Sequence, residues 1–117
     1  MQLEQKQENG ILFLQLKGDL MGDQNNMEVL EAANLALDQK IHCCAVDLSA
    51  VRYMNSSGLG VLITLMTKFR NRNGELVLVS PSEQINKLLI ITKLNSIFNV
   101  MNSEGEARTF FEKIITQ

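Results

Sequence analysis

Two adjacent serines, Ser56 and Ser57, are the side chains of this sequence best placed for chemistry. They stand between an apolar segment with strand character and an apolar segment with helical periodicity. Backbone N–H groups at the start of a helix point outward and favour an anion there. A phosphate on one of these hydroxyls would therefore suit the helix and could act as a switch.

Catalysis has little support in the sequence. A histidine-dependent triad would have to use His42, the single histidine, with Asp47 and one of the two serines. His42 and Asp47 lie near opposite ends of one predicted strand, roughly 15 Å apart at the rise of a strand, which is too far for a hydrogen-bonded relay. The glycines after the serines lack the third glycine and the lysine of phosphate-binding loops. We therefore expect no enzyme, cofactor or metal site, and a small hydrolase or nucleotide-binding protein is the weaker alternative.

A purely structural role is the competing explanation for the serines. Asn55, Ser56 and Ser57 are all good N-cap residues, and three in a row could simply start a helix. Gly58 and Gly60 favour a functional role, because glycine costs about 1 kcal/mol relative to alanine inside a helix. The two glycines predict that another molecule approaches the first helical turn.

The first forty residues predict a hairpin and a helix. Residues 3–5 pair with the apolar run 11–16 across a turn at Glu8, Asn9 and Gly10. Residues 25–39 carry apolar side chains at helical spacing, with acids and amides between them.

A βαβ unit follows. The unbroken apolar runs 43–48 and 76–79 are typical of parallel strands covered on both faces. Between them, Leu59, Leu62 and Met66 mark one face of a helix that Asn73 and Gly74 close. This spacing favours Leu59 as a core residue, with exposure on a docking face as the alternative. The helix start falls just past the carboxyl end of the first strand, where open α/β sheets present functional loops.

The last forty residues predict two more helices. Ser80 and Glu83 form a capping box with Pro81 at the first helical position. Ser103 and Glu106 form a second capping box. Residues 97–100 predict an edge strand between these helices.

Composition predicts one soluble domain. The chain has 117 residues, 45% of them hydrophobic, and a net charge of −2. Acids and bases are interspersed, so nucleic acid or an anionic membrane surface is not an expected partner. We expect no membrane insertion and a cytoplasmic location. Cys43 and Cys44 are adjacent in a strand and point to opposite faces, which predicts reduced core thiols.

The run from Asp47 to Thr64, D-L-S-A-V-R-Y-M-N-S-S-G-L-G-V-L-I-T, resembles the signature of the STAS domain of bacterial anti-sigma factor antagonists. Gly18-Asp19-Leu20 is similar to a turn that lies near the partner surface in this family. Together with length and element order, the resemblance covers essentially the whole chain. It implies a single α/β STAS-type domain over residues 1–117, with an N-terminal hairpin joined to a mostly parallel central sheet and about four helices.

The resemblance also implies a function. Such proteins bind an anti-sigma factor that is also a serine kinase, and phosphorylation at the start of the second helix ends binding until a serine phosphatase reverses it. The phosphoacceptor of the motif falls on Ser56. The implied partner-binding residues are Asp19, Asn55, Ser56, Ser57, Gly58 and Leu59.

Two residues depart from the family pattern. Asn55 and Met21 each replace a usual Asp, which removes charges that a partner could contact. The alternative function is a STAS binding subunit without phosphorylation, docked on a transporter ATPase or a signalling assembly.

Overall fold

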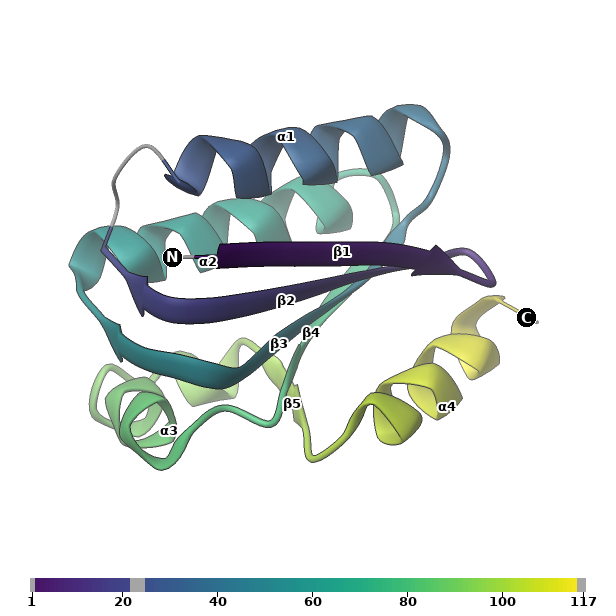
Figure 1. The fold of residues 1–117 in the computed structure, drawn as a ribbon. Coiled ribbons are helices and arrows are strands. Elements are labelled where there is room, and N and C mark those ends of the chain that lie inside the picture. The colour runs from purple at the N-terminus through teal and green to yellow at the C-terminus, as the bar shows by residue number, and fades with distance from the viewer. Residues whose placement is uncertain (1, 22–24, 116–117) are drawn as a thin grey trace.

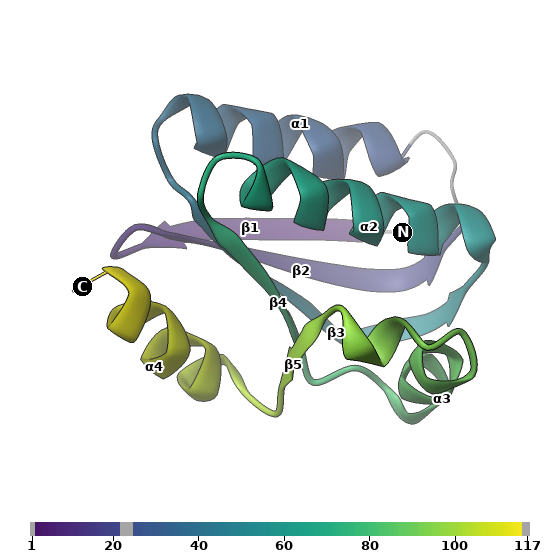
Figure 2. The ribbon, with the colours of Figure 1, turned by 180° about the vertical axis from the view of Figure 1, so that it is seen from behind.

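The computed structural model describes residues 2–21 and 25–115. The elements, in chain order, are β1 (Gln2–Glu8), β2 (Ile11–Leu20), α1 (Asn25–Asp38), β3 (Cys43–Met54), α2 (Ser56–Arg70), β4 (Glu75–Val79), α3 (Glu83–Ile91), the 3-10 turn η1 (Leu94–Ser96), β5 (Asn99–Met101) and α4 (Glu104–Ile115). The strands form one sheet in the order β1-β2-β3-β4-β5, with β1 antiparallel to β2 and the other pairs parallel. Helices α1 and α2 cover one face, and α3 and α4 lie on the other (Figures 1 and 2). The predicted α/β class is confirmed.

The N-terminal hairpin is longer than its apolar residues suggest. Glu8 pairs with Ile11 across a two-residue turn in which Asn9 and Gly10 both have positive φ, 52° and 81°. Such a turn matches the twist of the two strands, and asparagine followed by glycine is its preferred sequence. Most side chains of β1 are exposed and polar, with Leu3 half-buried. The strand therefore rests on its pairing with β2 more than on burial.

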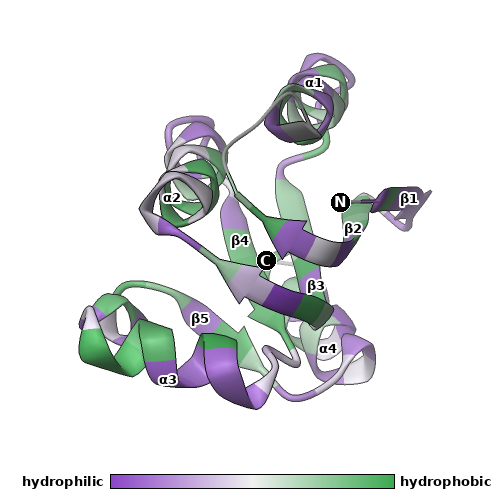
Figure 3. Ribbon diagram, turned by 60° about the vertical axis from the view of Figure 1, so that its left-hand side comes forward, coloured by the Kyte–Doolittle hydropathy of each residue, from purple (hydrophilic) through white to green (hydrophobic). Residues whose placement is uncertain are grey.

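Alternating side chains of the central strands contribute to two cores, and the larger one extends beyond the face under α1 and α2 to Ile85 and Leu89 of α3. Leu12 and Leu14 of β2 join the larger core under α1 and α2, whereas Ile11 and Phe13 join the smaller core. Apolar residues colour much of the central strands in Figure 3, which also shows the helices on both sides of the sheet. Burying both faces explains the unbroken apolar runs of the sequence.

Strand β3 runs well past the predicted end of its apolar run. Residues 43–47 pair with β4 on one side and with β2 on the other. Residues 50, 51, 53 and 54 pair with β2 after a register shift that follows residue 47, and a second shift falls between residues 51 and 53. After Leu48, exposed and buried side chains no longer form a continuous buried run, as expected for a part of the strand with fewer neighbours. The Ser82 hydroxyl donates to the Val51 carbonyl at 2.9 Å and ties this extension to the start of α3.

The end of α2 confirms the predicted cap and refines it. Asn73 takes the left-handed conformation, with φ of 61°. The Asn73 N–H donates to the Arg70 carbonyl and the Gly74 N–H to the Phe69 carbonyl, the pattern of a Schellman motif. Gly74 is needed for a different reason, because a β-carbon there would overlap the His42 carbonyl.

The start of α3 differs from the prediction. Ser82, rather than Ser80, is the N-cap, and its side chain accepts the N–H of Ile85. Ser80 has a positive φ of 49° and its hydroxyl donates to the Asn102 carbonyl at 2.6 Å. Pro81 therefore precedes the cap and is not the first helical residue. Both serines suit a cap in sequence, and the tertiary bonds of Ser80 decide between them.

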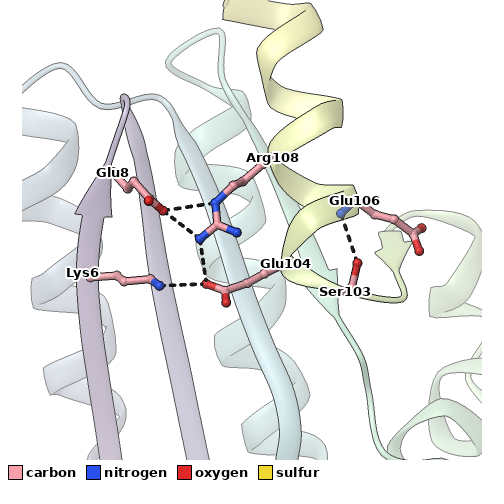
Figure 4. A network of polar contacts seen from close by, with 6 residues as sticks. All are labelled: Lys6, Glu8, Ser103, Glu104, Glu106 and Arg108. Carbon is pink, nitrogen blue, oxygen red and sulfur yellow. Dashed lines mark hydrogen bonds and ion pairs between the residues drawn. The ribbon is translucent and has the colours of Figure 1, made fainter.

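Helix α4 is fixed to the hairpin by a polar network, shown in Figure 4. Arg108 bonds Glu8 at 2.8 Å, and Lys6 pairs with Glu104 at 3.2 Å. Arg108 also lies 3.7 Å from Glu104. The network holds the helix on the smaller core, where Phe111 is fully buried.

Candidate functional site

The two serines lie where the sequence places them, at the start of α2 just past the end of β3 (Figure 1). Ser56 and Ser57 are the first two residues of α2, and both are exposed. The end of β2 lies beside them, because Leu20 pairs with Met54. This end of the sheet is therefore the candidate site.

Asn55 is the N-cap of α2, and its side chain also ties the end of β2 to the helix. Its Oδ1 accepts the N–H of Gly58 at 2.9 Å, and its Nδ2 donates to the Met21 carbonyl at 3.0 Å. An aspartate could make the first bond but has no donor for the second. The departure from the family pattern at residue 55 thus has a local structural reason.

The charge balance at the helix start suits an added anion. Among the described residues, the first turn of α2 contains no acidic side chain, and its last turn carries Lys68 and Arg70. A dianion on Ser56 would meet the positive end of the helix dipole. The N-cap residue next to Ser56 adds no negative charge, because residue 55 is an amide.

Asp19 forms an ion pair with Arg52 at the same end of the sheet. The guanidinium donates to both carboxylate oxygens, at 2.9 and 3.1 Å. These hydrogen bonds hold the pKa of Asp19 below its ordinary value and raise that of Arg52. Asp19 remains a predicted partner-binding residue, and its pairing with Arg52 was not predicted because the two residues are 33 apart in the sequence.

Gly58 requires a correction. A β-carbon at Gly58 would lie well inside 3.0 Å of the Leu20 carbonyl oxygen and 2.8 Å from Cγ of Met54. The group that approaches this glycine is therefore the chain's own strand β2, and the explanation by an approaching partner is wrong here. Gly60 has open space around its Cα, with nothing within 4 Å of a β-carbon. The open part of this turn is at Gly60.

Leu59 lies in the core, with 8% of its surface exposed. Its spacing with Leu62 favours this burial. Leu59 therefore anchors the first turn of α2 to the larger core. Two side chains that sequence analysis did not select are exposed at this end: Tyr53 is 52% exposed and Met21 is 41% exposed. Tyr53 is paired with Asp19 across β2 and β3.

Metal-ligating side chains and the two cysteines are the other groups that the sequence offers for chemistry. The His, Cys, Asp and Glu side chains of residues 2–21 and 25–115 form no group of three that could hold a metal ion. Cys43 and Cys44 are buried free thiols on opposite faces of the sheet, and burial raises the pKa of both. None of the described helices is long and apolar enough to span a membrane.

Comparison with known proteins identifies the family. The family model of the STAS domain matches residues 2–107. The chain belongs to the STAS domain family. An anti-sigma-B factor antagonist of Listeria monocytogenes is 43% identical to this STAS domain over 61 residues, 52% of this chain and 54% of the relative. The match thus spans about half the length of that relative.

Two other relatives match nearly end to end. An anti-sigma F factor antagonist of Paenibacillus polymyxa is 23% identical to this STAS domain over 97% of each chain. The Bordetella bronchiseptica protein BtrV is 31% identical over 113 residues, 96% of each chain.

Solved structures share the fold of this STAS domain. The Bacillus cell fate determinant SpoIIAA in its phosphorylated form superposes with a TM-score of 0.75 at 18% identity, over 94% of this chain and 99% of that one. The unphosphorylated anti-sigma factor antagonist SpoIIAA gives a TM-score of 0.72 at 16% identity, over 95% and 96% of the two chains.

Proposed function

We propose that this STAS domain is an anti-sigma factor antagonist that binds an anti-sigma factor with serine kinase activity and is released when Ser56 is phosphorylated. The observation that carries the proposal is an exposed serine at the first position of α2, next to an amide N-cap, in the family signature. The names of the relatives from Listeria and Paenibacillus support the antagonist role. A serine phosphatase would return the chain to its binding form.

Phosphorylation at this position would leave the fold intact. A phosphoserine carries about −1.5 to −2 charges at pH 7, and an anion at a helix N-terminus is stabilising by about 0.3 to 1 kcal/mol. Ser56 is exposed, so the phosphate needs no space inside the domain. The chain would therefore change its charge at the site while keeping its shape.

The same phosphate would disrupt an interface. Unmodified Ser56 is small and neutral, so a partner can pack against it and against the exposed Tyr53 nearby. A dianion buried there must lose its water, and an apolar or acidic surface offers no compensation. Converting a 99:1 bound population to 1:99 requires about 5.5 kcal/mol, a size that burial of an unpaired dianion can supply.

The direct test is affinity capture with the purified chain from an extract of its source cells, followed by incubation with Mg-ATP. Intact mass should show one added phosphate, and peptide mapping should place it on Ser56. Ser56→Ala should abolish the mass change, while the matched variant Ser57→Ala should retain it. Phosphate on Ser57 alone would defeat the assignment, and a stable captured partner without any phosphate transfer would favour the binding-subunit alternative.

Partner affinity gives a second test. Ser56→Asp should weaken binding of the captured partner at least tenfold, about 1.4 kcal/mol, without lowering the melting temperature. Asn34→Asp, which adds the same charge at an exposed position of α1, should leave affinity unchanged. Titration calorimetry measures both, and equal affinities for wild type and Ser56→Asp would count against the mechanism.

A further inference from the structure

A cavity lies on the face of the sheet opposite α1 and α2. Parallel sheets are usually covered on both faces, and α4 covers this face over the smaller core. Next to the start of α4, a cavity of about 220 Å³ remains, lined by residues of β1 to β4 and by Glu104. Its floor includes the side chains of Phe13, Ala45 and Val79. This site is on the face opposite α2.

The walls of the cavity carry unbalanced negative charge. Three carboxylates line it, those of Glu4, Asp47 and Glu104, against one ammonium, that of Lys6. Lys6 pairs with Glu104 at 3.2 Å (Figure 4), and Glu4 pairs at 3.2 Å with Lys17, which lies outside the lining. Among the described residues, Asp47 has no ion-pair partner, and its Oδ1 accepts the N–H of Ser49 at 2.8 Å. Asp47 is thus the carboxylate of this cavity that has no cationic partner among the described residues.

Two further features favour a cation with an apolar body. The Gln15 side chain lines the cavity and is partly buried, and it makes no hydrogen bond to another described residue. Its amide oxygen can accept from a donor group beside Asp47. The Phe13 ring already has two cations of the chain near it, the Lys6 ammonium at 5.3 Å and the Arg108 guanidinium at 5.0 Å from its centroid, so it offers a ligand apolar contact while the ligand's charge belongs beside Asp47. An anionic ligand would meet the three carboxylates and be repelled.

We propose that this cavity binds a small organic cation, whose ammonium or guanidinium group is held by Asp47 and Gln15 and whose short apolar body lies over Phe13, Ala45 and Val79. The volume corresponds to roughly seven waters at about 30 Å³ each, which limits the ligand to a compact molecule. The site needs no partner protein and no phosphate on Ser56, so this inference is independent of the proposed function.

The test is a titration of the isotope-labelled chain with n-butylguanidinium, followed by amide chemical shifts. Saturable shifts should appear at the cavity residues, with a dissociation constant on the order of millimolar, as expected for a probe of so few atoms. n-Butylurea, an uncharged molecule of nearly the same shape, should bind at least tenfold more weakly. Shifts that do not saturate, or an equal response to the urea, would overturn the proposal.

Variants locate the site. Asp47→Asn keeps an acceptor for the Ser49 N–H and removes the charge, and it should weaken n-butylguanidinium binding at least tenfold. Glu31→Gln, which removes a carboxylate from an exposed position of α1, should stay within twofold of wild type. If Asp47→Asn does not fold, Gln15→Lys decides, because a lysine ammonium beside Asp47 should fill the site and abolish binding. Unchanged binding by folded Asp47→Asn or Gln15→Lys would overturn the assignment.

Discussion

Replacing Gly58 by alanine, alongside the same change at Gly60, tests why α2 begins with two glycines. The two positions are two residues apart in one helix, and intrinsic helix propensity favours alanine at each by about 1 kcal/mol. Their surroundings differ completely. A β-carbon at Gly58 would overlap the Leu20 carbonyl, whereas one at Gly60 would meet nothing within 4 Å.

The expected magnitude follows from what would have to move. Overpacking costs typically about 1 to 3 kcal/mol, and the upper part of that range applies when the obstructing group is backbone. The Leu20 carbonyl is held at the end of β2, where it also accepts the Asn55 N–H. Subtracting the propensity gain of about 1 kcal/mol, Gly58→Ala should lower the free energy of unfolding by about 2 kcal/mol. Gly60→Ala should raise it by about 0.5 to 1 kcal/mol.

Urea unfolding of wild type and both variants measures the difference, provided that the slope m is unchanged. The two identical substitutions should differ by about 3 kcal/mol in the free energy of unfolding. If Gly58→Ala proved as stable as Gly60→Ala, the close contact between α2 and β2 would not be the reason for glycine at position 58. In that case the approach of an external partner would again be the better explanation.

Three further predictions concern the same end of the sheet. Asn55→Ala should lower the free energy of unfolding in urea by about 1 to 2 kcal/mol, because α2 loses its N-cap and the Met21 carbonyl loses its hydrogen-bond donor. An unchanged urea midpoint would contradict this role of Asn55. Leu59→Ala should cost about 2 to 5 kcal/mol as a core truncation, whereas near-native stability with impaired partner binding would indicate a contact residue. Because the Arg52 hydrogen bond lowers the pKa of Asp19 from 3.8, the pair stabilises the fold above that pH, and the benefit is lost as pH falls toward the lowered pKa. Asp19→Asn should therefore flatten the acid limb of a stability profile measured between about pH 5 and 2, and an identical profile would refute the linkage.

Sequence patterns predicted the elements whose burial is regular. Strands buried on both faces gave unbroken apolar runs, and the helices gave apolar faces at helical spacing. The extension of β3 to Met54 was not predicted, because its side chains follow uneven pairing with β2 and not a simple alternation. The cap of α3 was misassigned for a related reason, since a bond from Ser80 to Asn102 is invisible in sequence.

The candidate site was predicted in part. The signature located Ser56 and Asn55 at a helix start, because cap residues and glycines have local meaning. The reason for Gly58 was missed, since it depends on a strand that ends 38 residues earlier. The partner of Asp19 and the exposure of Tyr53 depend on how β2 and β3 pair, which no local pattern encodes.

Because β3 pairs unevenly, its two halves should differ in the free energy needed to open them locally. Residues 43–47 are held between two strands, whereas residues 50–54 pair with β2 and rely on the Ser82 hydroxyl for a further bond. Fewer hydrogen bonds must break to open the second segment, so it belongs to a less protected cooperative unit than the centre of the sheet. We therefore expect the end of the sheet that presents the serines to open at a lower free energy than the centre of the sheet, and hydrogen exchange would measure the difference.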